Sequence, residues 1–217
     1  MKKRNKIVPY NAIWLIAAFV AWTLLLGEVD VQPIGPCGSA VGLATLNGWF
    51  HALTGVNMSL YVITDWLGLV PIAVAFAFAI LGLVQLIKRK RFLKVDHGIL
   101  VLGGFYIAVI AAYLLFEYIV VNYRPVLIEG YLEVSYPSST TLLVLCVMIT
   151  AAMQLNDRIK SKAWAIVVII GIVAFTVFMV IGRLLSGVHW LSDIVGGALL
   201  SSGLVTLYAW AADLVKK

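Results

Sequence analysis

Apolar residues gather in six long runs along the chain, and short polar connections separate them. A helix needs about 20 residues to cross the hydrocarbon core of a bilayer, so most of these runs are long enough to span a membrane. The second run is long enough to tilt or protrude, and the fourth, which is the shortest, is expected to lie deepest among its neighbours. We therefore predict an all-α fold, a bundle of six transmembrane helices. The runs cover approximately residues 8–27, 57–87, 98–121, 138–155, 163–185 and 189–212.

The connections on one side of this bundle are distinctive. Residues 28–56 form a long loop in which Trp49 and Phe50 suit a helix that lies on the membrane surface, so we predict an interfacial helix in this first loop. Residues 122–137 form a second polar loop on the same side. Only residues 186–188 separate the fifth and sixth runs, which predicts that the last two helices are antiparallel neighbours.

Composition supports a membrane protein with a single domain over residues 1–217. Hydrophobic residues make up 63% of the chain, charged residues 12%, and the mean hydropathy is +1.03. Soluble domains are about half apolar and a quarter charged, so this chain is expected to be an integral membrane protein. The first run follows a basic start, as a signal peptide does, but it is long enough to span and no small-residue cleavage pattern follows it, so we expect a retained helix.

The formal net charge of +6 serves as a topology signal. Of the 16 Lys and Arg residues, all but two lie on one side of the predicted bundle. By the positive-inside rule that side is cytoplasmic, so both termini are predicted to be cytoplasmic, and nucleic acid is not an expected partner. The two exceptions, Arg124 and Arg183, fall on the outer side, where an anion is expected to hold them. The cytoplasmic set is Lys2, Lys3, Arg4, Lys6, Lys88, Arg89, Lys90, Arg91, Lys94, Arg158, Lys160, Lys162, Lys216 and Lys217.

Candidate chemistry begins with the stretch "GRLLSGVHWLSD", residues 182–193. His189 and Asp193 are four apart at the start of the last helix and therefore share a face. A carboxylate there can bond one imidazole nitrogen and leave the other free to attack or bind. Arg183 ends the preceding helix, and a tight turn can fold it back toward His189. Taken singly, each residue also fits a structural role, as a helix cap or an interfacial side chain.

Two further segments carry residues that suit phosphate. Arg124 precedes Pro125 after the third run, and a guanidinium can grip phosphate oxygens through two parallel bonds. In "YPSSTTLL", residues 136–143, Ser138 or Ser139 is a good N-cap, and helix N-termini bind phosphate through free N–H groups. An interfacial anchor and an ordinary cap are the structural alternatives.

Together the three segments resemble the type 2 phosphatidic acid phosphatase superfamily, which also includes vanadium-dependent haloperoxidases. The family pattern is Lys-x6-Arg-Pro, then Pro-Ser-Gly-His, then Ser-Arg-x5-His-x3-Asp. The third motif matches at Arg183, His189 and Asp193 with its full spacing. The first matches at Arg124 and Pro125 and the second at Pro137 and Ser138, in the family's order and over nearly the whole chain.

The resemblance implies a mechanism and a set of roles. His189 would be the nucleophile that forms a phosphohistidine, and Asp193 would orient its ring. Arg124 and Arg183 would clamp the phosphoryl oxygens, and Ser138, with backbone N–H groups near Ser139, would donate to the same oxygens. No cofactor or metal is implied, which agrees with the lack of a His or Cys cluster at ligand spacing.

Two positions depart from the family pattern. Glu117 replaces the first-motif Lys, about two helical turns before Arg124, and would repel a phosphate unless it pairs with an arginine or binds a cationic headgroup. Thr140 replaces the His that protonates the leaving oxygen, and a threonine hydroxyl is too weak an acid for that step. A lipid diphosphate, whose leaving group is already good, is therefore expected to react better than a monoester. His51, in the first outer loop, is an alternative acid, although an interfacial histidine is commoner.

The sequence thus predicts a multi-pass cell-membrane phosphatase that acts on a lipid phosphate or diphosphate, such as a polyprenyl diphosphate or a phospholipid, at the outer face. The alternative is a catalytically impaired relative that binds or transports phosphate-headed lipids. A channel is less favoured because no ionisable residue falls near the centre of a span, and a haloperoxidase because those enzymes are soluble. Gly197 and Ser201 form a small-residue seam in the last helix, which is expected to press against the helices that carry Arg183 and Ser138.

Overall fold

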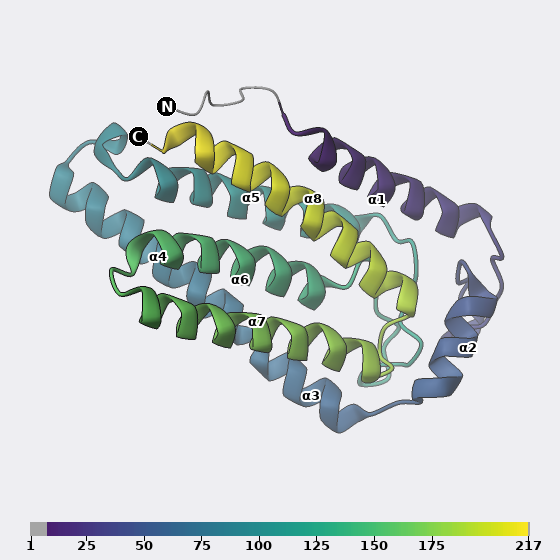
Figure 1. The fold of residues 1–217 in the computed structure, drawn as a ribbon. Helices are drawn as coiled ribbons and strands as arrows, with labels where there is room; N and C mark the ends of the chain where they lie inside the picture. The colour runs from purple at the N-terminus through teal and green to yellow at the C-terminus, as the bar shows by residue number, and fades with distance from the viewer. Residues whose placement is uncertain (1–7, 217) are drawn as a thin grey trace.

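The computed structural model describes residues 8–216, which form an all-helical bundle (Figure 1). Six helices or helix pairs among these residues are long and apolar enough to cross a membrane, as predicted. The predicted basic residues Lys2, Lys3, Arg4, Lys6 and Lys217 lie outside the described residues. The helices are α1 (Tyr10–Glu28), α2 (Ala44–Thr54), α3 (Met58–Leu67), α4 (Leu69–Arg89), α5 (His97–Tyr118), α6 (Ser139–Arg158), α7 (Lys162–Leu185) and α8 (Leu191–Val215), with short 3-10 helices η1 (Pro36–Gly38) and η2 (Phe92–Lys94).

Local side chains fix where several helices begin. Asn57, Asp96, Ser138 and Ser161 are N-caps whose side-chain oxygens accept a hydrogen bond from a backbone N–H in the first turn. Gly68 separates α3 from α4, which together form the span Met58–Arg89 of 32 residues. That span is the longest of the six, as the second apolar run predicted.

The centre of the bundle lies around α6 and α8. Of the six spans, α6 has the largest buried share, as predicted for the fourth run. A Cβ atom on Gly196 of α8 would meet Tyr136, one on Gly197 would meet the α6 N-cap Ser138 and Thr141 of α6, and one on Gly203 would meet Ile16 of α1, each at 3.2 Å or less. The small residues therefore let α8 pack closely against α1 and α6.

One prediction about helix order is wrong. The last two helices are not primary neighbours, because α6 packs between α7 and α8 and contacts both extensively (Figure 1). The connection between Leu185 and Leu191 is short, but it runs past the end of α6 rather than folding α8 back onto α7. The glycine seam of α8 accordingly meets α6, which Ser138 caps, and not α7, which carries Arg183.

The two ends of the bundle differ in character. At one end α2 lies across the helices at a steep angle (Figure 1). Its Trp49 and Leu53 are exposed. The first loop therefore holds a helix where an interfacial helix was predicted. The opposite end carries the described basic residues of the η2 region and of the α6–α7 connection.

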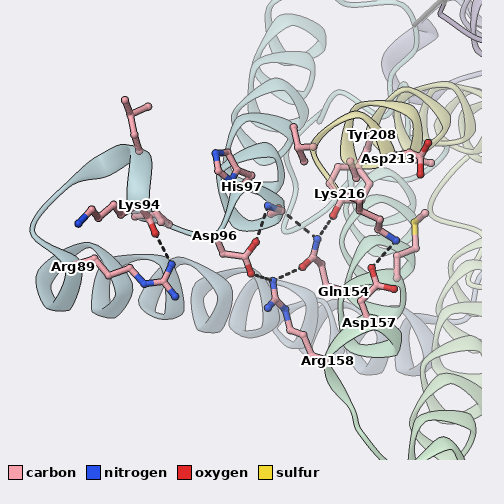
Figure 2. A pocket seen from close by; sticks show the side chains of 17 residues that line it. Arg89, Lys94, Asp96, His97, Gln154, Asp157, Arg158, Tyr208, Asp213 and Lys216 are labelled. Carbon is pink, nitrogen blue, oxygen red and sulfur yellow. Dashed lines mark hydrogen bonds and ion pairs between the residues drawn. The ribbon is translucent and has the colours of Figure 1, made fainter. Parts of the chain in front are cut away.

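A polar network ties the helices together at the basic end (Figure 2). Arg158 donates to Asp96 and to Gln154, and Gln154 in turn donates to the hydroxyl of Tyr208 at 2.6 Å. These residues line a cavity of about 810 Å³ between α5, α6 and α8. Because its hydrogen bonds join side chains of all three helices, the network links α5, α6 and α8.

Candidate functional site

His189 and Asp193 meet at the end of the bundle that α2 covers. His189 lies in the turn before α8, and Asp193 occupies the third position of that helix. The Nδ1 atom of His189 is 3.7 Å from Oδ2 of Asp193, a separation slightly too long for a full hydrogen bond. Both side chains are buried. The carboxylate can therefore attract the Nδ1–H and turn Nε2 away from itself.

Asp193 is held by neighbours on both of its oxygens. The backbone N–H of Trp190 donates to Oδ2 at 2.9 Å, and the Nδ2 group of Asn122 donates to Oδ1 at 3.1 Å. Asn122 also donates to Ser192, and Asn47 of α2 bonds both the backbone and the hydroxyl of Ser192. These contacts anchor α2 and the start of α8 to each other, so the Asp193 carboxylate has a fixed orientation.

Arg124 faces the other nitrogen of His189. Its Nη1 group donates to Nε2 of His189 at 3.4 Å, and its Nε is ion-paired with Glu133 at 2.9 Å. The connection between α5 and α6 folds back on itself here, since the backbone N–H of Arg124 donates to the carbonyl of Glu133. The guanidinium therefore lies beside the nitrogen that Asp193 leaves free.

Burial and nearby cations keep His189 uncharged. Desolvation lowers the pKa of His189 from 6.5 to about 4, and the positive charges of Arg124 and Arg183 act in the same direction against the opposing effect of Asp193. A neutral imidazole with Nδ1–H toward Asp193 has its lone pair on Nε2, which is the form that a nucleophilic histidine needs.

Arg183 is close to the site without lining its cavity. The side chain is 2% exposed, and its Nη2 group is ion-paired with Asp65 at 3.1 Å. Its guanidinium lies 4.9 Å from the centre of the Tyr61 ring, and that of Arg124 lies 5.8 Å from the same ring. The two arginines therefore share an aromatic neighbour, and Arg183 acts on His189 through its charge.

The serine and threonine residues before α6 face different ways. Ser138 is fully buried, and its hydroxyl caps α6 by accepting from the N–H of Thr141. Ser139 lines the same polar cavity as His189 and Arg124, whereas Thr140 lines an adjoining apolar groove. The structure thus brings Ser139, and not Ser138 or Thr140, to the cavity beside the imidazole.

The polar cavity has a volume of about 420 Å³ and lies between the end of α5, the α5–α6 connection and His189. Glu117 and Glu133 line it together with Arg124. The apolar groove, about 560 Å³, runs between α4, α5 and α6 and shares Tyr113, Ser139 and Leu142 with the cavity. A polar cavity thus adjoins an apolar groove on the membrane-spanning helices.

His51 does not point at this cavity. Its Nε2 atom lies 3.1 Å from the carbonyl oxygen of Gly187, and its ring lies 5.4 Å from that of Trp190. The nitrogen that could give up a proton is therefore engaged with the turn before His189. This arrangement favours a structural role for His51.

Several residues of the site escape sequence reasoning. Asn47, Asn122 and Glu133 lie in polar loops, where such residues are ordinary, and Tyr61 lies in an apolar run. Of these residues, Asn122 is the one whose position in the sequence points to the site, because it comes two residues before Arg124 at the exit of a span. The partners of these residues are up to 145 positions away, so only the folded chain reveals them.

No family model matches the chain, and no curated protein matches it. A solved structure does match, the crystal structure of the first transmembrane PAP2-type phosphatidylglycerolphosphate phosphatase from Bacillus subtilis. The two chains are 19% identical, and the alignment covers 96% of this chain and 99% of the other with a TM-score of 0.59. The chain therefore has the fold of a PAP2-type membrane phosphatase, which confirms the fold implied by the resemblance. The six apolar spans and this fold make it a multi-pass membrane protein.

Proposed function

We propose that the protein is a membrane phosphatase that hydrolyses a lipid phosphate or diphosphate through a phosphohistidine on His189. The contact between Arg124 and Nε2 of His189 supports this proposal, because a guanidinium suits phosphate and lies beside the imidazole nitrogen that we propose as the nucleophile. The fold shared with a PAP2-type phosphatase supports it.

The reaction follows from the positions of these groups. A phosphoryl group enters the polar cavity and its oxygens bind Arg124, with Ser139 as a further donor. Nε2 of His189 forms a bond to phosphorus while the bond from phosphorus to the leaving oxygen breaks. Water then attacks phosphorus, the P–N bond breaks, and inorganic phosphate leaves. Asp193 stabilises the positive charge that the imidazole gains in the first step.

The lipid tail has a place next to the cavity. The groove between α4, α5 and α6 is lined mostly by apolar side chains and joins the cavity at Tyr113, Ser139 and Leu142. A tail in this groove keeps its headgroup beside His189. Because most of the described basic residues lie at the opposite end of the bundle, we assign the cavity to the outer face of the cell membrane.

The leaving group sets the expected substrate preference. Thr140 lines the apolar groove, and a threonine hydroxyl is a poor general acid at neutral pH. A phosphate leaving group needs less help than an alkoxide, so a polyprenyl diphosphate should be hydrolysed faster than its monophosphate. Phosphate release from the two lipids in the same detergent measures this, and faster release from the monophosphate would reject the preference.

Trapping the intermediate tests the function itself. Brief incubation with ³²P-labelled lipid should give an acid-labile, alkali-stable phosphoprotein in the unaltered protein and none in His189→Ala. His97→Ala is the matched control, because His97 is exposed and lies at the opposite end of the bundle. Labelling that survives in His189→Ala would show that another residue is the nucleophile.

The alternative is a protein that binds or transports phosphate-headed lipids without hydrolysing them. Thr140 favours it, since a threonine hydroxyl is a poor general acid for the leaving oxygen but does not hinder lipid binding. Lipid binding without phosphate release or phosphohistidine over a broad panel of lipids would establish this alternative.

A further inference from the structure

Acidic residues dominate the end of the molecule where the candidate site lies. Most of the chain's ten Asp and Glu residues are there, whereas only Arg124 and Arg183 of its basic residues are. The acidic set is Glu28, Asp30, Asp65, Glu117, Glu129, Glu133 and Asp193. This excess of negative charge disfavours a lipid headgroup that carries negative charge alone.

The lining of the cavity also has more acidic than basic residues. Glu117 and Glu133 line it, and Arg124 is the one Lys or Arg residue among its described lining residues. Arg124 is ion-paired with Glu133 through its Nε, so a phosphate that binds the guanidinium lies next to that carboxylate and competes with it. The bound state would then hold a phosphate and two carboxylates against one arginine. A ligand that supplies a cation of its own removes this conflict.

Two aromatic residues of α5 line the cavity together with the two carboxylates. Tyr113 and Phe116 line the same cavity, one turn and one residue before Glu117 on α5. Carboxylates with aromatic rings are the combination that binds organic ammonium groups, through charged hydrogen bonds and cation–π contacts. The cavity volume of about 420 Å³ leaves room for a phosphate and a small amine together.

We propose that Glu117 and Glu133 select a lipid headgroup in which an ammonium group lies within a few bonds of the phosphate. The inference rests on the proposed function, because it uses the same cavity and adds the class of headgroup. In this arrangement the phosphate binds Arg124 beside His189 and the ammonium replaces Arg124 as the partner of Glu133. The family Lys at position 117 would be incompatible with such a headgroup, and a glutamate is required.

A matched pair of lipids tests this directly. Sphingosine 1-phosphate has a free amine two carbons from its phosphate ester, and N-acetylsphingosine 1-phosphate has the same skeleton with the amine neutralised. Both are monoesters with similar leaving groups, so the preference for a good leaving group affects both rates equally and does not change the ratio of their kcat/KM values. We expect kcat/KM for phosphate release to be at least about tenfold higher for the free amine, the size of a charged hydrogen bond. Glu117→Gln should reduce that ratio several-fold, and Glu117→Lys should reverse it.

Glu129→Gln is the matched control variant. It removes the same charge from the same end of the molecule, but Glu129 does not line the cavity, so the ratio should stay as in the unaltered protein. Equal rates for the two lipids would overturn the inference, and so would a ratio that falls as much in Glu129→Gln as in Glu117→Gln. In either case phosphate would still be released, so the proposed function would stand. Added Mg²⁺ that raises the N-acetyl rate to the free-amine rate would also overturn it, because a metal ion would then be the missing cation.

A binding measurement tests the preference for an amine-bearing headgroup independently of hydrolysis. The shift of melting midpoint produced by each lipid is measured in the unaltered protein, in His189→Ala and in Glu117→Gln. If neither lipid nor a polyprenyl diphosphate releases phosphate, the proposed enzymatic function fails. A larger shift for the free amine that disappears in Glu117→Gln still supports amine selection in that case. Equal shifts would overturn it.

Discussion

The imidazole of His189 is a strongly perturbed group because it is buried among cations. Desolvation, Arg124 and Arg183 all disfavour the imidazolium form, and Asp193 compensates only in part, so the pKa falls to about 4. As a result, Nε2 is unprotonated throughout the neutral range and is available as a nucleophile. In the proposed reaction, a phosphate beside Arg124 and Nε2 would offset the charge of the cations with its own negative charge, and the positive phosphohistidine would then form more easily.

The free protein should therefore keep His189 neutral in mild acid. In ¹⁵N-histidine NMR spectra in detergent micelles, we expect the resonances that vanish in His189→Ala to report a neutral ring at pH 5.5. Its folded pKa lies below the value of 6.5 for an unfolded chain. The stability this group contributes is thus complete above pH 6.5 and is lost as pH falls toward 4. A ring that protonates near pH 6.5 in the folded protein would contradict the burial described here.

At the scale of helices, the packing of α8 against the start of α6 sets how close His189 lies to Ser139. The backbone of Gly197 lies against Ser138 and Thr141, and Ser201 donates to the carbonyl of Gly197 one turn before it. This contact joins the helix that follows His189 to the helix that Ser139 begins. In a bilayer the hydrophobic effect gives helices little reason to associate, so close packing at small residues supplies much of the attraction.

Replacement of Gly197 by leucine should separate these helices. A Cβ atom at Gly197 would lie 3.2 Å from the Ser138 carbonyl oxygen and from Thr141 Cβ, and the rest of the side chain has no space. We expect a loss of about 1–3 kcal/mol in unfolding free energy, measured as a lower melting midpoint in detergent. Gly171→Leu is the control, because Gly171 is exposed on α7 with no atom within 4 Å of an added Cβ. Equal midpoints for the two variants would refute the role of the seam.

The elements were predictable from the sequence to the extent that hydropathy determines them. Long apolar runs give six spans, and caps such as Ser138 give helix starts, because both depend on residues that are near in sequence. The order of packing was not predictable, since a short connection between α7 and α8 does not reveal that α6 inserts between them. In the site, His189 lies in the turn before α8 and not on a face of that helix, yet its spacing from Asp193 was short enough to bring the two side chains within 3.7 Å. The ion pair between Arg183 and Asp65 was not predictable, because it joins residues 118 positions apart.

Across the whole molecule, charge and apolar surface act together to orient the bundle. Large apolar side chains such as Trp14, Phe76 and Ile107 are exposed around its sides, where lipid would cover them. Most described basic residues lie at one end and most carboxylates at the other. Positive charge is retained on the cytoplasmic side of membranes. The cavity that contains His189 should therefore open outward, where it meets lipids of the outer leaflet.

The two cysteines of the chain make this orientation measurable. Cys37 is exposed in the first loop at the site end, and Cys146 is buried within α6. In intact spheroplasts, a maleimide that cannot cross membranes should label the protein once, and Cys37→Ser should abolish the label. In the Cys37→Ser background, a cysteine introduced by Lys90→Cys at the basic end should react only after the membrane is permeabilised. If Cys37 instead required permeabilisation while the substituted position 90 reacted in intact spheroplasts, the site would face the cytoplasm and its substrates would be lipids of the inner leaflet.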